Sequence, residues 1–254
     1  MPTIIARRYD TLGPVTLEIE GERIARVYPA AERPELPLVA PGFVDLQING
    51  FGGIEFNDPE LTIEKVRQVA LSQDGFGVTA FLATCTTDGH HVLVHALSTI
   101  AAAIRELPEV AVRIHGIHLE GPYISPDDGP RGAHPRQHVR TPDWDEFRRL
   151  QDAAEGRIKL TTVSPEYASA PDFISRVADS GVLVAIGHTK ATSDQIQAAV
   201  DAGARMSTHL GNGAHPLIRR HPNYIWDQLA EDRLVLTQSK VCQEQELGHA
   251  QGVL

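Results

Sequence analysis

Three residues whose side chains can bind a metal ion each stand at the end of a short apolar run. Glu120 belongs to the string HLEGP, His188 to GHT and His209 to THL. Parallel barrels carry their chemistry at the C-terminal ends of their strands. Two imidazoles and one carboxylate form a known catalytic zinc set that leaves one position open for water. The apolar runs that lead into the three residues are read as buried strands at 114–119, 182–186 and 206–208.

The spacing of these three residues fits neighbouring units of one barrel. Glu120 and His188 are 68 residues apart, and His188 and His209 are 21 residues apart. A strand-helix unit of such a barrel takes about 30 residues, so the two gaps fit two units and one short unit. Taken singly, a histidine at a strand end is usually a hydrogen-bonded structural residue, and Glu120 can be a plain turn residue before Gly121. All three residues stand at strand ends, and their spacing matches the repeat of the barrel, which favours one shared site.

Composition and charge limit the class of protein. The chain has 254 residues, of which 42% are hydrophobic, enough for one large or two modest domains. Its formal net charge of -10 argues against a general nucleic-acid binder but does not exclude a small anionic substrate. Basic residues gather in two stretches, which are either solvated loops or anion contacts. The first holds Arg131, His134, Arg136, His138 and Arg140, and the second holds Arg219, Arg220 and His221.

Cysteine content and apolar runs indicate a soluble, cytoplasmic protein. Two cysteines, Cys85 and Cys242, are too few for a disulfide framework. The first residues, MPTIIARRYD, lack the apolar core of a signal peptide. No run approaches the roughly 18 apolar residues of a membrane span. We therefore expect neither a membrane nor a nucleic acid among the partners.

The pattern of the chain changes near residue 39. Residues 3–28 alternate apolar and polar side chains, which predicts short antiparallel strands with a turn near Gly21. Residues 29–37 hold three prolines and read as a linker. From residue 39 onward strand and helix patterns alternate, which indicates a parallel sheet.

Six strand-helix units can be followed from residue 39 to residue 208. Thr192 with Gln195 predicts a helical capping box, and Pro142 after Thr141 predicts another helix start. After His209 the periodicity weakens. The expected strands lie at 41–50, 78–84, 114–119, 158–163, 182–186 and 205–208, and the expected helices start near 58, 91, 141, 172, 192 and 224.

Five motifs together resemble the N-acetylglucosamine-6-phosphate deacetylases, a family of the amidohydrolase superfamily. The resemblance runs from residue 1 to about residue 234. It implies a metal-dependent (β/α)8 TIM-like barrel with a small β domain, and hydrolysis of the acetamido group of a 6-phosphorylated amino sugar. Complete family members are expected to be homodimers. The motifs are PGFVDLQINGFGG at 41–53, HLEGPYISP at 118–126, RGAH at 131–134, GHT at 187–189 and THLGN at 208–212.

The resemblance also implies a metal set. Glu120, His188 and His209 match the family's ligands for one divalent ion, with zinc expected and Fe²⁺ or another divalent ion as alternatives. Many amidohydrolases carry an HxH pair on the first strand for a second metal, where this chain has Gln47 and Asn49. These amides favour a single metal, and they can equally serve only as hydrogen-bonding groups in the barrel mouth.

The resemblance assigns substrate contacts to further residues. His134, beside Ala133, matches the histidine that approaches the acetyl carbonyl, where it would stabilise the developing oxyanion. Asn212 and Gly213 match the pair that contacts the sugar phosphate. Arg220 matches the phosphate arginine, and a guanidinium suits phosphate because it donates two parallel hydrogen bonds. In a complete enzyme, the metal would acidify a bound water and a carboxylate base would move its proton to the leaving amine.

The C-terminal part departs from the family pattern. The family carries a catalytic aspartate at the end of its last barrel strand, whereas only Asp227 and Asp232 follow His209 here, and neither ends an apolar strand. A later DGxH string and the strands that return to the small β domain are also absent. We therefore expect an incomplete barrel of about six units. The predicted divisions are a β portion with linker (1–38), a barrel portion with the metal site (39–234) and an atypical tail (235–254).

Three functions remain open on this sequence. The first is a working deacetylase whose base comes from elsewhere. The second is a truncated or frame-shifted relative that is catalytically inactive. The third is another zinc-dependent barrel enzyme for sugar phosphates, such as an aldolase, although the QxN string at 47–49 and the HLEGP context argue against it. Acetate release from an N-acetylated sugar phosphate separates the first from the other two.

Overall fold

The structure is a computed structural model that describes residues 1–237. The chain forms two compact units, of which the first is Met1–Phe43 and the second begins at Val44. The sequence placed this boundary five residues earlier, after residue 38. The difference arises because a short strand, Leu38–Val39, directly follows the predicted linker and joins the first sheet.

The first unit is a four-stranded sheet in the order β3-β2-β1-β4. Strands β1, β2 and β3 are antiparallel neighbours, and β4 runs parallel to β1. The turn near Gly21 joins β2 to β3, as the alternation predicts. Val15 and Leu17 are buried on one face of β2. The strands are β1 (Thr3–Arg8), β2 (Pro14–Glu20), β3 (Arg23–Pro29) and β4 (Leu38–Val39).

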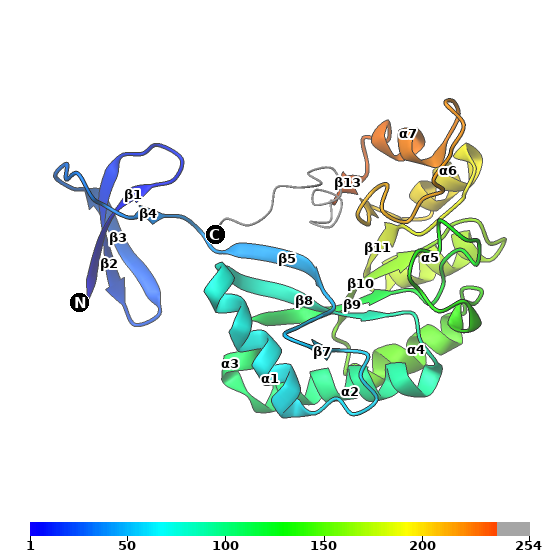
Figure 1. Cartoon of the computed structure of the whole chain (residues 1–254), viewed down its shortest axis with the longest axis horizontal. Helices are drawn as coiled ribbons and strands as arrows, with labels where there is room; N and C mark the ends of the chain where they lie inside the picture. Colours follow the sequence, from blue (N-terminus) through cyan, green and yellow to red (C-terminus); the bar gives the residue numbers. More distant parts are fainter. Residues whose placement is uncertain (238–254) are drawn as a thin grey trace. The chain divides into compact units, whose positions relative to one another are not determined.

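The second unit holds a curved sheet in the order β13-β12-β11-β10-β9-β8-β5, and helices follow its strands along one side (Figure 1). This arrangement confirms the predicted incomplete barrel. Its strands are β5 (Phe43–Ile48), β8 (Val78–Thr86), β9 (Ile114–Glu120), β10 (Ile158–Val163), β11 (Leu183–Ile186), β12 (Met206–Ser207) and β13 (Val235–Leu236). A separate hairpin, β6 (Gly50–Phe51) with β7 (Ile54–Glu55), follows β5.

Seven helices lie in the second unit within the described part of the chain. They are α1 (Ile63–Ser72), α2 (His90–Glu106), α3 (Pro108–Ala111), α4 (Trp144–Ala153), α5 (Ala170–Asp179), α6 (Ser193–Asp201) and α7 (Tyr224–Leu229). Short 3-10 turns occupy Gln73–Phe76 and Arg136–His138. None of the helices in residues 1–237 is both long and apolar enough to cross a membrane.

Strand β13 adds a seventh strand where the sequence analysis counted six. It runs parallel to β12, with Met206 opposite Val235 and Ser207 opposite Leu236. The Thr237 N–H donates to the Ser207 carbonyl at 3.0 Å. A strand of two residues is too short to give a periodic pattern in the sequence, so it is recognised only by its pairing with β12. The tail predicted from residue 235 thus begins inside the sheet, and its remainder lies outside the described residues.

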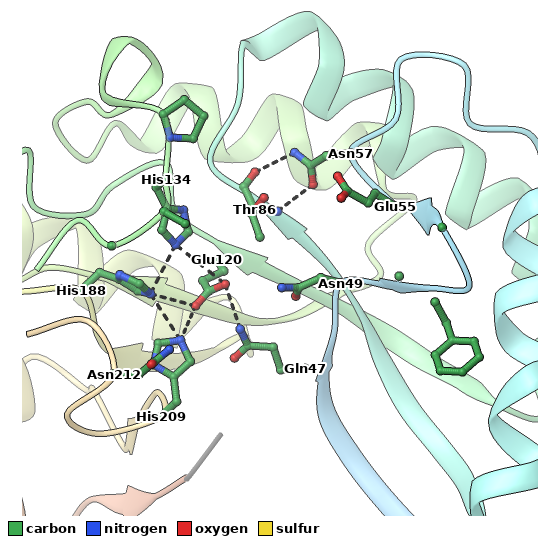
Figure 2. Close-up of a pocket in the computed structure, with 16 residues that line it drawn as sticks. Gln47, Asn49, Glu55, Asn57, Thr86, Glu120, His134, His188, His209 and Asn212 are labelled. Carbon is green, nitrogen blue, oxygen red and sulfur yellow. Dashed lines mark hydrogen bonds and ion pairs between the residues drawn. The ribbon is translucent and has the colours of Figure 1, made fainter. Parts of the chain in front are cut away.

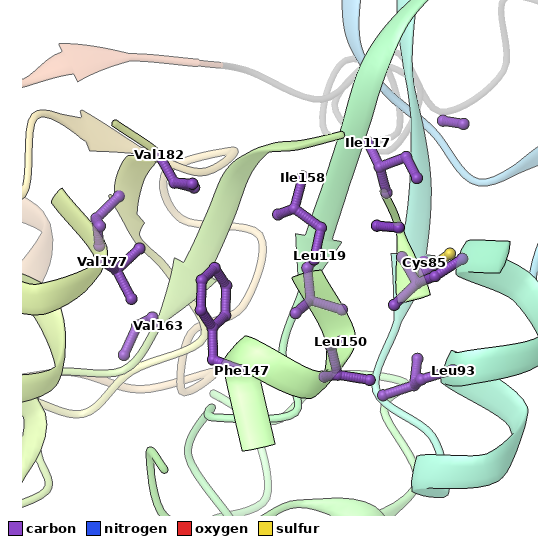
Figure 3. Close-up of a cluster of buried hydrophobic side chains, with 14 of the residues drawn as sticks. Cys85, Leu93, Ile117, Leu119, Phe147, Leu150, Ile158, Val163, Val177 and Val182 are labelled. Atoms are coloured by element: carbon purple, nitrogen blue, oxygen red, sulfur yellow. The ribbon is translucent and has the colours of Figure 1, made fainter. Parts of the chain in front are cut away.

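The two faces of the curved sheet carry different side chains because successive strand residues point to opposite sides. On β9, Ile117 and Leu119 join the large core between sheet and helices (Figure 3). On β10, Leu160 belongs instead to a small cluster with Ala185 and Met206. Glu120 alternates with Leu119, which puts its carboxylate on the side away from the helices.

Two helix starts predicted from sequence have different outcomes. The capping box of Thr192 and Gln195 at α6 is confirmed. The start at Thr141–Pro142 is wrong, because α4 begins after Asp143. The carboxylate of Asp143 accepts a hydrogen bond from the Glu146 N–H at 2.7 Å and so caps the helix.

Candidate metal centre and substrate cavity

The three predicted metal ligands come together at the C-terminal edge of the curved sheet (Figure 2). Glu120 ends β9, while His188 and His209 each follow a strand end by two residues. Glu120 Oε1 lies 3.1 Å from His188 Nε2 and 2.7 Å from His209 Nε2. The two Nε2 atoms are 3.3 Å apart. All three side chains are buried.

His134, from the loop between β9 and α4, reaches the same point. Its Nε2 lies 3.3 Å from His188 Nε2 and 4.0 Å from Glu120 Oε2. The ligand atoms of Glu120, His134 and His188 all lie within 4.8 Å of one another. The site is therefore a buried Glu/His/His group that could bind a metal ion. Two triads are available, and they share Glu120 and His188.

The hydrogen bonding of His188 fits a cation at this point. Its Nδ1 lies 2.9 Å from the carbonyl oxygen of Pro130, which can only accept, so Nδ1 carries the ring proton. Nε2 then has no proton, and its lone pair faces Glu120 Oε1, which is also an acceptor, at 3.1 Å. A cation between these atoms turns an unfavourable contact into coordination. Backbone carbonyls commonly orient metal-binding histidines in this way.

The carboxylate of Glu120 is held from a further side. Gln47 Nε2 donates a hydrogen bond to Glu120 Oε2 at 2.9 Å. Gln47 thus orients the carboxylate, in agreement with the hydrogen-bonding interpretation of the QxN string. Asn49 lines the same cavity.

The environment sets the protonation of the cluster. Burial alone would raise the pKa of the Glu120 carboxyl, but contacts with the His188 and His209 rings hold that pKa well below its usual value. Burial and the neighbouring His188 lower the pKa of His134 to about 4. An ionised carboxylate and neutral imidazoles are the forms that bind metal ions.

Two of the three predicted ligands adopt strained backbone conformations. His188 has φ of 48° and His209 has φ of 26°, in the left-handed region that non-glycine residues rarely adopt. Such strain of order 1–3 kcal/mol per residue persists only where surrounding structure enforces it, and it clusters at functional sites. Gly213 provides part of that enforcement. A Cβ on Gly213 would lie 2.6 Å from His188 Nδ1, so only glycine allows this approach.

A cavity of about 680 Å³ opens above the cluster. Ala133, His134 and Asn212 line it, where the resemblance assigned substrate contacts. Gly213 packs against His188 instead of lining this cavity. Arg220, which the structure describes, is exposed and is not among the lining residues, so its phosphate role stays a prediction.

Sequence reasoning missed part of the cavity wall. The hairpin β6–β7 contributes Phe51 and Glu55, and Asn57 and Thr86 complete that side. Asn57 Nδ2 donates to the Thr86 carbonyl at 3.0 Å, and Asn57 Oδ1 accepts from the Thr86 N–H at 2.8 Å. The glycine-rich string NGFGG was the available signal, because glycines at such spacing indicate a tight hairpin.

The carboxylates of this cavity are few. Among the described residues that line it, only Glu55 and Glu120 carry one. Asp227 instead accepts a hydrogen bond from the Ser193 hydroxyl at 2.9 Å, and Asp232 is exposed. Neither of these aspartates lines the cavity, so neither is placed as the base that the resemblance led us to expect.

Fold and site together define a protein of the parallel-barrel class with a buried group that could bind a metal ion, and its polar residues lie at the C-terminal edge of the strands. The chain belongs to the amidohydrolase family, which residues 38–225 match.

Curated relatives refine this class. An N-acetylglucosamine-6-phosphate deacetylase of Bacillus subtilis (strain 168) is 32% identical over 206 residues, covering 80% of this chain and 51% of the relative. An N-acetylgalactosamine-6-phosphate deacetylase of Shewanella sp. (strain ANA-3) is 34% identical over 210 residues, covering 80% of this chain and 50% of the relative. The chain thus spans about half the length of the curated relatives it matches.

A solved structure agrees with the fold. The N-acetyl-D-glucosamine-6-phosphate deacetylase of Mycobacterium smegmatis is 32% identical, with a TM-score of 0.81, over 94% of this chain and 63% of that chain. An aspartate-to-alanine mutant of the same enzyme, in complex with N-acetyl-D-glucosamine-6-phosphate, gives 33% identity and a TM-score of 0.80, with the same coverage of both chains.

Proposed function

We propose that this chain carries the metal site and the acetyl-binding site of a deacetylase for N-acetylated amino-sugar 6-phosphates. The observation that carries the proposal is the convergence of Glu120, His188 and His209 beside His134 at one cavity. The deacetylase names of the relatives support it. The products would be acetate and the free amino-sugar phosphate.

One divalent ion, with zinc expected, would be held by Glu120, His188 and His209. When bound, it supplies a Lewis acid that polarises the amide carbonyl and acidifies a water molecule. Two of the protein's own residues would assist this chemistry. His134 donates a hydrogen bond to the carbonyl oxygen as negative charge develops there. Gln47 keeps the Glu120 carboxylate in place.

The phosphate would be recognised at the far end of the substrate from the acetamido group. Asn212 and Gly213 belong to the turn that follows His209, and Arg220 lies on the same exposed stretch. The cavity is ample for a hexosamine phosphate, since ligand pockets usually range from about 300 to 1,000 Å³. Both hexosamine epimers occur among the relatives, so both substrates belong in the test.

An inactive relative is the second candidate, and the scarcity of carboxylates around the cavity favours it. Glu120 is committed to the metal cluster, and Glu55 lies on an exposed hairpin. Without a carboxylate near the scissile bond, proton transfer to the leaving amine loses a contribution of roughly 10²–10⁴ in rate. We expect this chain by itself to be a poor deacetylase or none.

The decisive experiment uses purified chain with added zinc. Metal content is measured first, then acetate release from N-acetylglucosamine 6-phosphate and from N-acetylgalactosamine 6-phosphate, each against a His209→Ala control. Acetate release that requires His209 supports the active enzyme. One bound zinc per chain without acetate supports the inactive relative. A chain that binds no zinc contradicts the proposed metal site.

A further inference from the structure

A half-buried glutamate that does not line the cavity joins three loops of the curved sheet. Glu166 lies in the loop after β10, and its Oε2 accepts from the Ser164 hydroxyl at 2.8 Å and from the Lys190 N–H at 3.1 Å. Its Oε1 accepts from the Ser125 hydroxyl at 3.1 Å. Both serines are buried. An ionised carboxylate only accepts, so donors from the loops after β9, β10 and β11 converge on one group.

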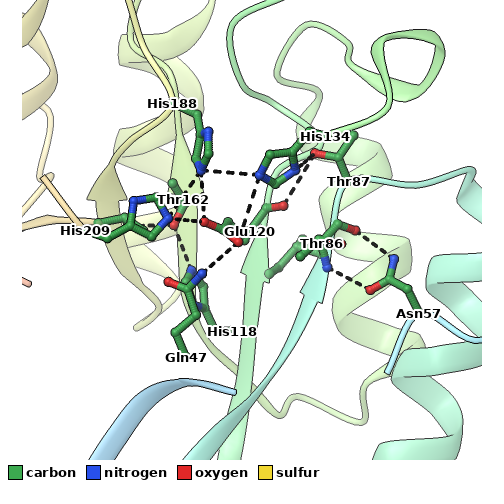
Figure 4. Close-up of polar contacts among 12 residues, drawn as sticks. Gln47, Asn57, Thr86, Thr87, His118, Glu120, His134, Thr162, His188 and His209 are labelled. Carbon is green, nitrogen blue, oxygen red and sulfur yellow. Dashed lines mark hydrogen bonds and ion pairs between the residues drawn. The ribbon is translucent and has the colours of Figure 1, made fainter. Parts of the chain in front are cut away.

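Two of these loops carry histidines of the metal cluster. The loop after β9 holds Ser125 and His134, and the loop after β11 holds His188 and Lys190. The Nε2 atoms of the two histidine rings lie 3.3 Å apart (Figure 4). Glu166 therefore joins the two histidine-bearing loops through contacts that lie outside the cluster itself.

The contacts form a closed ring of hydrogen bonds that passes through the backbone of His188. The Ser125 N–H donates to the His188 carbonyl at 2.9 Å, while the Ser125 hydroxyl donates to Glu166. From His188 the chain runs through Thr189 to Lys190, whose N–H donates to Glu166. His188 has the strained φ of 48°, which persists only where neighbouring contacts enforce it. The ring fixes the peptide groups that follow His188 and so supplies part of that enforcement.

The inner and outer parts of this junction differ in exposure. On the inner side, Ser164 Oγ also lies 2.8 Å from the hydroxyl oxygen of Thr189, which is 2% exposed. On the outer side, Lys190 Nζ lies 2.6 Å from Asp127 Oδ2, and each of these two side chains is 42% exposed. Exposed ion pairs contribute little, because solvent screens them. The buried contacts of Glu166 must therefore hold the loops together.

We propose that Glu166 is a positioning residue of the metal site, which holds the loop of His188, and with it the loop of His134, ready to receive a divalent ion. A prearranged site binds more tightly, because less ordering is required when the ion enters. The inference rests on the proposed metal site and adds a residue that supports this site without contacting the ion or the cavity.

Zinc affinity of the folded protein tests this role without any need for turnover. Glu166→Ala removes the acceptor of all three donors and should weaken zinc binding roughly 10-fold, as is usual for residues that orient metal ligands. Glu166→Gln keeps one acceptor oxygen and should stay within about threefold of the wild type. Lys190→Ala is the control, because it breaks only the exposed ion pair and keeps the N–H that donates to Glu166. Its zinc affinity should be unchanged.

Competition with a chromophoric chelator measures the zinc dissociation constant, and circular dichroism with urea denaturation measures the folding of each metal-free variant. A wild-type dissociation constant in folded Glu166→Ala would overturn the proposal, even if the variant is less stable, and so would an equal loss in Lys190→Ala. If Glu166→Ala does not fold, Ser125→Ala decides, since it removes one hydroxyl of the ring and keeps the N–H that donates to His188. Weaker zinc binding in Ser125→Ala supports the proposal, and unchanged binding overturns it.

Failure of the proposed function would be seen separately in the wild type. A wild-type chain that binds no zinc contradicts the proposed metal site and the role of Glu166 together. Zinc binding without acetate release contradicts only the proposed activity, because the role of Glu166 is measured by zinc affinity.

Discussion

The small sheet of the first unit and the curved sheet of the second differ in how they bury their apolar side chains. In the first unit, β3 is exposed along its length, with Ile24 at 58% and Val27 at 54% exposure. In the second, Leu119 and Phe147 are at most 1% exposed and belong to one continuous core. The free energy of folding must therefore reside largely in the second unit, because stabilisation follows the apolar area removed from water.

The candidate site lies entirely in the second unit, whose core is well packed. Its ligands stand at strand ends of the curved sheet. The residues that contact these ligands, Gln47 and Pro130, belong to the same unit, as does Thr87, which contacts His134. A rigid sheet can hold two ligands in strained backbone conformations, which a poorly packed sheet could not. We expect site and core to respond to mutation, while the first unit tolerates change.

The largest effect should come from removing a metal ligand. His188→Ala removes the lone pair that faces Glu120 and should reduce bound zinc from one per chain to nearly none. His115→Ala, an exposed histidine on the same strand as Glu120, is the matched control and should leave zinc content unchanged. Metal analysis after dialysis measures both. Equal zinc in the two variants would place the metal elsewhere.

A core substitution should separate the two units by stability. Phe147→Ala empties space between Trp144 and Phe173, whose rings lie 5.9 and 5.8 Å from that of Phe147. It should lower the free energy of unfolding by about 3–5 kcal/mol. Val27→Ala on exposed β3 should change it by under about 0.5 kcal/mol. Urea denaturation followed by circular dichroism measures both. Similar losses of unfolding free energy would show that the two units contribute equally to stability.

Loss of the predicted phosphate ligand, Arg220, should have a smaller effect, and only on the affinity for the substrate. Arg220→Ala should weaken binding of N-acetylglucosamine 6-phosphate roughly 10-fold, because it removes charge-assisted hydrogen bonds, and should leave binding of N-acetylglucosamine unchanged. Arg219→Ala serves as the neighbouring control. Calorimetric titration of the zinc-loaded protein distinguishes them. Equal losses for both ligands would remove Arg220 from the phosphate site.

The smallest effect should be a pH dependence of stability from Glu146. Burial raises the pKa of this carboxyl, but Arg140, with help from His90, brings the net pKa below its usual value. A lowered folded-state pKa means that the ionised group stabilises the fold above the unfolded-state pKa, near 4.3, and that this stability is lost as pH falls below it. Glu146→Gln should cost roughly 0.5–1 kcal/mol at pH 7, because solvent screens part of this interaction, and progressively less toward pH 3. A cost that does not depend on pH would show that packing, and not charge, matters here.

Local sequence was sufficient for most strands of the curved sheet and for the three predicted metal ligands. The period-two and helical patterns predicted six of the seven strands of the curved sheet, and Thr192 with Gln195 predicted a cap that the structure has. Strand ends are visible in a sequence because apolar runs stop there. Glu120, His188 and His209 could thus be selected before any geometry was known.

Tertiary structure alone decided what surrounds those residues. Strand β13 has too few residues for a pattern and exists because β12 offers a parallel edge. The sequence could equally not foretell that Asp143 would outcompete Thr141 as a cap, since that depends on the direction in which the loop enters α4. The contacts that orient the site join residues far apart in the chain: Gln47 with Glu120, Thr87 with His134, and Pro130 with His188. A sequence pattern records which side chains a strand presents, but only the packing of distant segments fixes which atoms meet and where each proton lies.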